Sequence, residues 1–321
     1  MSGLVKAGVC IAFLTTSCSV DAQENYPQKS VLMIVPAAPG GAGDLVARAI
    51  APELSNSLGK TVVVDNRAGA SGTIGAALVA RSAADGYTLL VAPAPSIVVE
   101  PNYRKLDYNP LTDFAPITLV ATSPNILVVH PVLPVNSVKQ LIALAKAKPD
   151  AINFGSSGQG APSGIAGEVF NKLTGTRIAH VPFKGAGPAT VALLSGEVQV
   201  MFAPITVALP YVKDKRFRAL AVTSRNRSRA LPDLPTLIES GVPEDIVSFY
   251  GVFAPARTPQ SVVDTLHRAI ANVLKVPKVA EYFEKSAAEV VGSTPAQFST
   301  YVHEQYAFYG KIVKDIGLKS R

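Results

Sequence analysis

The chain has 321 residues, of which 48% are hydrophobic and 17% are charged. This length favours two domains with proper hydrophobic cores, and this composition excludes intrinsic disorder and fibrous architectures. The 30 Lys and Arg residues outnumber the 23 Asp and Glu residues and give a net charge of +7, but they are scattered and form no nucleic-acid-reading module. We therefore expect no nucleic-acid binding, and a mildly positive field that attracts small anions.

The first 22 residues have the pattern of a secretory signal peptide. Met1–Lys6 is a short basic start, Ala7–Val20 is mostly apolar, and Ala22 is a small residue suited to signal-peptidase cleavage. The apolar run is shorter than the roughly 20 residues that a membrane span needs. Cleavage after Ala22 removes both cysteines, Cys10 and Cys18, so the mature chain is expected to have no disulfide. We expect a periplasmic protein, with lipidation of Cys18 as the alternative.

The residues that follow predict a β-α-β-α-β unit. An apolar run precedes a Gly-rich loop, and a helical pattern with Asp44 as its N-cap continues to Gly59. A second strand, loop and helix lead to a third strand. The predicted elements are strand 31–36, a helix from 44 to about 59, strand 61–64, loop 66–72, helix 74–83 and strand 87–92.

The same unit recurs further along the chain. Its predicted elements are strand 151–154, loop 155–160, helix 163–173, strand 177–181, loop 183–187, helix 188–194 and strand 198–202. The spacing agrees closely, since Gly40 and Gly69 are 29 positions apart and Gly158 and Gly185 are 27 apart. Two parallel units, each with a Gly-rich loop at the carboxyl end of its first strand, predict a two-lobed α/β protein with a central cleft.

Two segments are expected to cross between the lobes. Strands 117–120 and 126–129 are separated by Ser123-Pro124-Asn125, and the chain returns through 248–254. Helical patterns over 261–274, 277–285 and 295–315 are expected to cover the first lobe. The predicted domains are a signal peptide (1–22), a first lobe (23–123 plus 251–321) and a second lobe (124–250).

The two Gly-rich loops are the candidate ligand-binding segments. Pro39–Asp44 and Gly155–Gly160 each lead into a helix N-terminus, where unpaired N–H groups and the helix dipole favour an anion. The second loop adds two serines and a glutamine as hydrogen-bond partners. Neither loop has the Gly-Lys-Ser/Thr of a phosphate loop. Lys184 and Arg67, on later loops, either add attraction or are solvated surface charges.

The sequence offers little for catalysis or metal binding. The four histidines lack metal-ligand spacing, and Gly155-Ser156-Ser157-Gly158 does not match the Gly-x-Ser-x-Gly nucleophile pattern. A serine can still meet a distant base, so an exported hydrolase using Ser156 or Ser157 is the competing class. We expect no catalytic residue, no metal and no cofactor.

Several longer stretches carry a family resemblance that covers almost the whole mature chain. They are Val35-Pro36-Ala37-Ala38-Pro39-Gly40-Gly41, Val64-Asp65-Asn66-Arg67-Ala68-Gly69, Asp85-Gly86-Tyr87-Thr88-Leu89-Leu90, Asp113-Phe114-Ala115-Pro116, Asn153-Phe154-Gly155-Ser156-Ser157-Gly158, His180-Val181-Pro182-Phe183-Lys184-Gly185 and Arg218-Ala219-Leu220-Ala221-Val222-Thr223-Ser224. With them the chain resembles the substrate-binding proteins of tripartite tricarboxylate transporters, also called the Bug family. The resemblance implies a type II periplasmic binding fold, a monomer that closes around one small organic acid, and transient delivery to membrane transporter subunits. A ligand-sensing adaptor for a membrane receptor is the alternative role.

The resemblance maps the ligand loops onto the two Gly-rich segments already chosen. Members usually carry Gly-Gly-Gly-Thr-Asp where this chain has Gly40-Gly41-Ala42-Gly43-Asp44, and many carry an acid after Met-Phe where this chain has Ala203-Pro204. The missing acid favours a ligand without an amine, namely a di- or tricarboxylate or an aromatic carboxylate. Phe249 and Tyr250 either supply an apolar wall or pack in the core. The candidate ligand-binding residues are Ala38, Pro39, Gly40, Gly41, Gly43, Asp44, Ser96, Ser156, Ser157, Gly158, Gly160 and Ala203.

Overall fold

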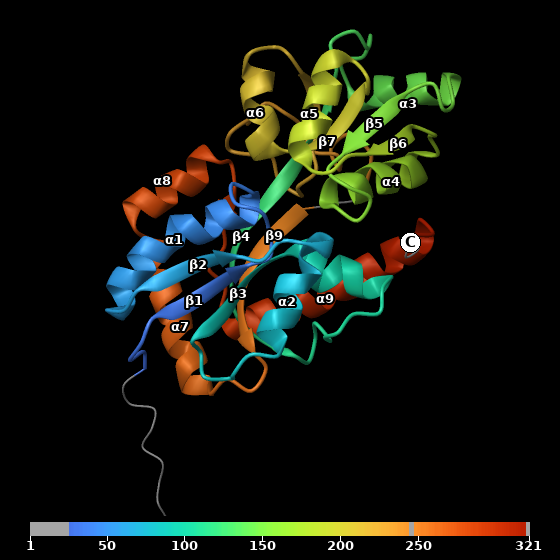
Figure 1. Ribbon diagram of the computed structural model, residues 1–321. Helices are drawn as coiled ribbons and strands as arrows, with labels where there is room; N and C mark the ends of the chain where they lie inside the picture. Colours follow the sequence, from blue (N-terminus) through green and yellow to red (C-terminus); the bar gives the residue numbers. More distant parts are fainter. Residues whose placement is uncertain (1–25, 244–246, 319–321) are drawn as a thin grey trace, which may run out of the picture.

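The computed structural model describes residues 26–243 and 247–318, which form two α/β lobes (Figure 1). The predicted signal peptide and its cleavage site lie outside the described residues. The strands are β1 (Val31–Val35), β2 (Val62–Asn66), β3 (Thr88–Pro93), β4 (Phe114–Val129), β5 (Asn153–Ser156), β6 (Ala179–Pro182), β7 (Val200–Pro204), β8 (Arg218–Val222), β9 (Val247–Pro255) and β10 (Glu289–Val290). The helices are α1 (Ala42–Leu58), α2 (Thr73–Ala80), α3 (Val138–Ala147), α4 (Pro162–Thr174), α5 (Ala186–Ser195), α6 (Ile205–Lys213), α7 (Gln260–Val273), α8 (Pro277–Lys285) and α9 (Pro295–Asp315), with a π-helical turn η2 (Pro95–Val99) and 3₁₀ turns η1 (Ala70–Gly72) and η3 (Glu100–Asn102).

Each lobe is a sheet with helices on both faces. We call lobe 1 the part built on the strand order β2-β1-β3-β9-β4, and lobe 2 the part built on β4-β7-β5-β6 with β8 also beside β4. The β-α-β pairs predicted from the repeat are parallel, whereas β4 and β9 run antiparallel to their neighbours. The buried side chains on the two faces of each sheet give the cores that a three-layer α/β architecture requires.

Strand β4 runs through both lobes without a break, and this corrects the prediction of two strands separated by Ser123-Pro124-Asn125. Its first part, as far as Pro124, pairs with β9, and from Asn125 onward it pairs with β7 and β8. The strand therefore exchanges one set of partners for another at the proline, so the missing N–H of Pro124 disrupts neither ladder. The buried Asn125 N–H donates to Thr223 Oγ1 at 2.9 Å, which ties the crossing to lobe 2.

Strand β9 pairs with lobe 1 strands from its first residue, Val247. We propose the lobe division at Pro124/Asn125 and assign β9, from Val247 onward, to lobe 1, whereas the sequence placed residues up to 250 in lobe 2. Strand β4 then runs through the junction, and the residues around Pro124, where its partners change, are the candidate hinge.

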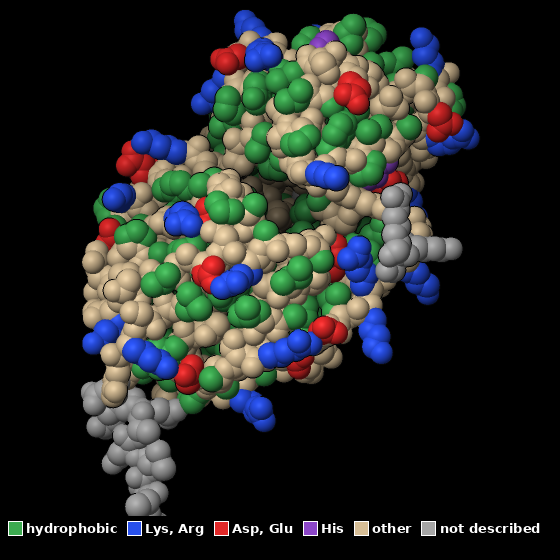
Figure 2. Space-filling view, viewed as in Figure 1, with side chains coloured by type: hydrophobic (Ala, Val, Ile, Leu, Met, Phe, Trp, Pro, Cys, Tyr) green, Lys and Arg blue, Asp and Glu red, His purple; other side chains and the backbone are tan. Residues whose placement is uncertain are grey.

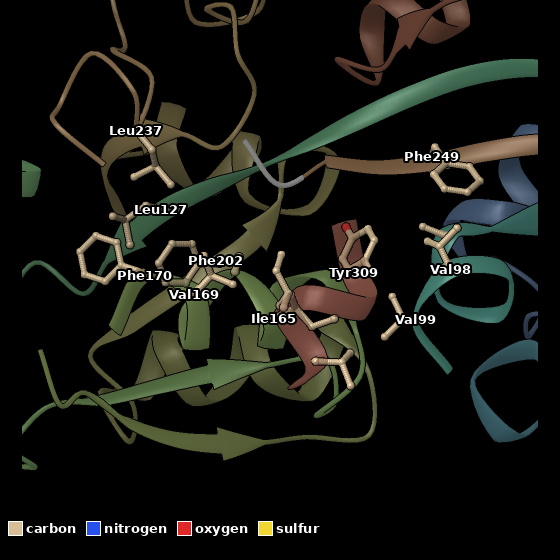
Figure 3. Packing of buried hydrophobic residues seen from close by; sticks show 14 of the residues in the cluster. Val98, Val99, Leu127, Ile165, Val169, Phe170, Phe202, Leu237, Phe249 and Tyr309 are labelled. Carbon is tan, nitrogen blue, oxygen red and sulfur yellow. The ribbon is translucent and has the colours of Figure 1, made fainter. Parts of the chain in front are cut away.

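The C-terminal helices pack on lobe 1 as predicted, and α9 also reaches lobe 2. Helices α7 and α8 lie against α1, while α9 packs on β4 and η2. In Figure 3, Tyr309 of α9 lies between Ile165 of lobe 2 and Val98 and Val99 of lobe 1, within one continuous buried cluster. At the end of α9, Asp315 forms an ion pair with Lys172 of α4, with Lys172 Nζ 3.3 Å from Asp315 Oδ2. Helix α9 is thus a second connection between the lobes.

Within the described part of the chain, no helix is both long and apolar enough to cross a membrane.

Candidate functional site

A cavity of about 370 Å³ lies between the lobes and is visible as the hollow at the centre of Figure 2. Lobe 1 contributes residues 36–38 and 68–72 with Pro93 and Pro95, and lobe 2 contributes residues 157–161. The volume suits a small molecule. No lining residue among those that the structure describes carries a charged side chain, so an anion held here must be bound by backbone and neutral polar groups.

Behind the first lobe 1 loop, Asp44 has a role other than the predicted one. The N-cap of α1 is Gly41, and Asp44 lies in the first turn with only 2% of its surface exposed. Its carboxylate accepts a hydrogen bond from the Gly40 N–H at 2.8 Å and pairs with Arg48 Nε at 2.8 Å. Burial acts to raise the pKa of Asp44, but the bonds from Gly40, Arg48 and Asn66 outweigh it and hold the pKa below its ordinary value. Asp44 therefore fixes the loop from behind.

The second lobe 1 loop is conformationally strained. Gly69, Ala70, Ser71 and Gly72 all have positive φ angles, of 134°, 46°, 55° and 92°. A positive φ is unfavourable for the alanine and the serine, and such strain is concentrated at functional sites. The turn also fits tightly, since a Cβ on Gly72 would lie 3.1 Å from the Pro36 carbonyl oxygen. The loop is thereby held against β1 at the wall of the cavity.

The lobe 2 loop is held by hydrogen bonds to the start of α4. The Ser157 N–H donates to Ser163 Oγ at 3.0 Å, and the two hydroxyls are 2.7 Å apart. The Gly158 N–H donates to Ser156 Oγ at 3.2 Å, and the Gly158 carbonyl accepts from the Ala161 N–H at 3.2 Å. Gly158 has a φ of 142°, which only glycine adopts readily. These hydrogen bonds hold the loop in this conformation in the absence of a ligand.

Some amides of the cavity wall are left without partners. Within the described residues, the N–H groups of Ala37 and Ala38 in lobe 1 and of Gln159 and Gly160 in lobe 2 donate to no protein acceptor. All four residues line the cavity. Unpaired amides next to the N-termini of α1 and α4 form a favourable environment for anionic oxygens from two sides.

Ser156 lies behind this loop in contact with a histidine. Its Oγ is 2.7 Å from His180 Nε2, and His180 Nδ1 is 2.9 Å from Glu168 Oε1. Ser156 is completely buried. The sequence left open that a serine meets a distant base but did not identify His180 as that partner. The signal was present, because Phe154 and Ser156 share one face of β5 and His180 lies opposite Phe154 on β6.

The two lobes touch at one side of the cavity. A Cβ on Gly160 of lobe 2 would lie 2.6 Å from Tyr103 Oη and 3.0 Å from Glu100 Oε1, both in lobe 1. Glu100 is buried and forms an ion pair with Arg104 at 3.1 Å. Gly160 therefore allows the lobes to approach where a side chain would separate them.

The predicted site residues fall into two groups. Ala38, Ser157, Gly158 and Gly160 line the cavity. The others do not belong to its lining, namely Pro39, Gly40, Gly41, Gly43, Asp44, Ser96, Ser156 and Ala203. Ser96 packs its Cβ behind Gly72 and donates its hydroxyl to Pro93, and Ala203 is buried in β7 opposite Ile126.

Other candidates also lie outside the lining. Arg67 pairs with Asp65 at 2.9 Å, Lys184 is exposed, and Phe249 and Tyr250 are buried in the cores of lobe 1. The sequence predicts a loop over 66–72 but does not identify it as a wall of the cavity. The position of this loop could have indicated such a role, because it follows β2, the second strand of the first unit, just as loop 183–187 follows β6, the second strand of the repeated unit.

A larger hollow, of about 690 Å³, lies away from these loops, between residues 226–230 of lobe 2 and the α8–β10 region of lobe 1. Its lining includes Glu284 and Glu289, and one of its arginines, Arg227, is already paired with Glu239. Carboxylates repel an anion, and neither of the helix N-termini described above reaches this hollow. The cavity between the loops is therefore the better candidate site. Among the described residues, no cluster of His, Cys, Asp or Glu is suited to hold a metal ion.

Two α/β lobes that share strand β4, with a cavity between them that helix-preceding loops of both lobes line, define the class of two-lobed solute-binding proteins. The chain belongs to the tripartite tricarboxylate transporter receptor family, whose model matches residues 46–318. The resemblance in sequence and the predicted fold class are thus confirmed.

Relatives over the full length support this assignment. Protein BugT of Bordetella pertussis is 37% identical over 319 residues, which cover 98% of each chain. The structure of periplasmic binding protein BugD is 35% identical with a TM-score of 0.81, covering 92% of this chain and 100% of that chain. Two Rhodopseudomonas palustris structures contain acids. Rpa4515 with adipate is 35% identical with a TM-score of 0.82 over 91% of this chain and 98% of its own. MatC with malate is 30% identical with a TM-score of 0.80 over 90% of this chain and 100% of its own.

Proposed function

We propose that this protein binds a small organic acid with at least two carboxylates, in the periplasm after cleavage behind Ala22, and delivers it to the membrane subunits of a tripartite transporter. The observation that carries the proposal is the pair of loops with unpartnered amides on opposite walls of a neutral cavity. Adipate and malate, bound by the two related proteins, are both dicarboxylates and agree with such a clamp.

Backbone amides alone are sufficient for useful affinity. A hydrogen bond to a charged group contributes about 1.5–3 kcal/mol, so four bonds supply roughly 6–12 kcal/mol. A micromolar dissociation constant needs about 8 kcal/mol. Ser71, Ser157 and Gln159 in the lining can add further bonds. No buried arginine is required.

The cavity also favours an acid without an amino group. An ammonium group needs a carboxylate or several carbonyl oxygens, and no acidic side chain lines the cavity within the described residues. Glu100 is the acid next to Gly160, and it is already paired with Arg104. A di- or tricarboxylate therefore fits better than an amino acid.

Capture works by differential affinity for two lobe arrangements. A ligand bridges Ala37 and Ala38 on one wall and Gln159 and Gly160 on the other only when the lobes are close. Ligand binding therefore shifts the population towards the closed form. Strand β4 can bend at the junction, and a membrane partner can then distinguish the liganded form.

Hydrolysis is the competing function, because Ser156, His180 and Glu168 have the contacts of a serine triad. Ser156 is fully buried, so a substrate carbonyl cannot reach its Oγ. The neighbouring N–H groups of Ser157 and Gly158 donate to Ser163 and Ser156, so neither is available as an oxyanion donor. Binding without turnover is therefore the better-supported function.

Thermal unfolding with a ligand panel tests the proposal. Protein stripped of ligand by unfolding and refolding is mixed with dicarboxylates, tricarboxylates, aromatic acids and amino acids, each beside its methyl ester. A ligand at 100 times its dissociation constant stabilises by about 2.7 kcal/mol, which raises the melting temperature by several degrees. We expect di- or tricarboxylates to shift the midpoint and their esters not to. A flat response to every acid would refute acid binding, and turnover of ester substrates that Ser156→Ala abolishes would establish the hydrolase.

A further inference from the structure

A chain of hydrogen bonds runs from the surface of lobe 2 to the back of its ligand loop. Glu168 Oε1 on α4 meets His180 Nδ1 at 2.9 Å, and His180 Nε2 meets Ser156 Oγ at 2.7 Å. The same Oγ accepts the Gly158 N–H at 3.2 Å and lies 3.0 Å from the Gly158 carbonyl. With the Ser156 hydroxyl proton directed to His180, the chain ends on the N–H of Gly158, a residue that lines the cavity.

The histidine ring is fixed from two further sides. Phe154 stacks on it with ring centroids 4.3 Å apart and planes 11° apart. On α4, a Cβ at Gly164 would lie 3.2 Å from His180 Cε1 and 2.4 Å from the Gly158 carbonyl oxygen. A Cβ at Gly167 would lie 2.2 Å from the Phe154 ring. The two glycines thus let β5, β6 and the loop pack directly on α4, with Glu168 on the same helix face.

Glu168 determines the direction of the hydrogen bonds. An ionised carboxylate only accepts hydrogen bonds, so of the two tautomers of a neutral imidazole it favours the one with its proton on Nδ1. His180 Nε2 is then an acceptor and takes the Ser156 hydroxyl proton. The oxygen of Ser156 keeps its lone pairs for the Gly158 N–H. One acid at the edge of the lobe thereby orients a hydroxyl that is completely buried.

We propose that Glu168 and His180 are positioning residues that act through Ser156 to hold the Gly158 peptide, so that the adjacent Gln159 and Gly160 amides face the ligand carboxylate. Gly158 has a φ of 142°, and the loop needs an anchor to keep a conformation so far from the common regions. Neither Glu168 nor His180 lines the cavity. The inference rests on the proposed function for its ligand and on the loop geometry for its mechanism.

The first test needs no ligand. Nitrogen-15 NMR of the imidazole in the full-length ligand-free protein reports which ring nitrogen of His180 carries the proton, and hydrogen exchange reports the order of loop 155–161. We expect the Nδ1–H form in the wild type, and in Glu168→Gln a loss of that preference with exchange in the loop faster by about two- to tenfold, the change expected from one hydrogen bond. Glu197→Gln, an exposed acid of the same lobe, is the control and changes neither reading.

The second test is a double-mutant cycle on the affinity for adipate and malate. Glu168→Gln and Ser156→Ala each weaken binding by about two- to tenfold, and the double variant binds no more weakly than Ser156→Ala, because both changes remove the same anchor. Additive losses, or wild-type exchange in the Glu168→Gln loop, overturn the proposal. If the wild type binds no acid, the proposed function fails while the tautomer and exchange readings still decide on the anchor.

Discussion

Replacing Gly160 by alanine tests whether ligand capture brings the lobes together at this residue. The added Cβ would lie 2.6 Å from Tyr103 Oη and 3.0 Å from Glu100 Oε1, both of which belong to the opposite lobe. Gly160 is not among the residues with positive φ, so alanine fits its backbone. The cost of the substitution therefore falls on the contact between the lobes and not on the folding of either one.

The size of the effect follows from the distances. Contacts shorter than 3.0 Å to a Cβ essentially do not occur, so either the ends of the Tyr103 and Glu100 side chains or the lobes themselves must move by several tenths of an ångström. Overpacking of this kind costs about 1–3 kcal/mol. Because the ligand has to bridge the lobes, the same free energy is lost from binding, which weakens affinity by about 5- to 150-fold.

Isothermal titration with the acid that gives the largest thermal shift measures this loss. Gly187→Ala is the matched control, since a Cβ at that lobe 2 glycine has open space around it. Tyr103→Phe in the Gly160→Ala background removes the 2.6 Å contact and is expected to restore part of the affinity. Wild-type affinity in Gly160→Ala would refute the reasoning, because the lobes would then have to close without this contact.

Two further substitutions test how the lobe 1 loops are held. Asp44→Asn is expected to lower stability at neutral pH and to make the loss of stability in acid smaller, as measured by thermal unfolding between pH 3 and 7. The reason is that the pKa of Asp44 is lowered in the folded state. The stabilisation by Asp44 is therefore present above the unfolded pKa of about 4 and is lost as the pH falls through the folded pKa. An unchanged acid profile would show that the bond to Gly40 is unimportant. Ser71→Gly is expected to raise stability by up to about 1 kcal/mol by relieving its positive φ and to weaken acid binding through a looser wall. Lys215→Gly relieves a similar φ of 58° away from the cavity and should leave acid binding unchanged. Equal effects of Ser71→Gly and Lys215→Gly on affinity would contradict the role of loop 68–72 as a wall of the ligand site.

The repeat in the sequence was enough to predict the fold, because hydrophobic periodicity and Gly-rich loops are local signals. It failed where pairing is decided by distant segments. Ser123-Pro124-Asn125 looks like a strand break, yet β9 on one side and β7 with β8 on the other keep the backbone extended through it. A change of strand partners at one proline cannot be read from the strand itself.

The site was predictable at the level of loops and not of side chains. Asp44 has the chemistry of an N-cap, but the Gly40 N–H and Arg48 draw it into the first turn of α1. Ser156 and Ser157 are adjacent and chemically identical, and the alternation of β5 turns the first towards His180 and the second towards the cavity. Such choices depend on the packing of α4 and β6, which lie outside the loop's own sequence.

The two ligand loops are held by related but unequal devices. In each lobe a polar side chain in the first helical turn reaches back to a loop amide, Asp44 to Gly40 in α1 and Ser163 to Ser157 in α4. A carboxylate at a helix N-terminus compensates the positive end of the dipole, whereas a neutral hydroxyl leaves it intact. The α4 end therefore attracts a ligand carboxylate more strongly than the α1 end. The strained loop 68–72 gives lobe 1 a shaped wall, so under the proposed function we expect lobe 2 to contribute more to affinity and lobe 1 more to the choice between acids.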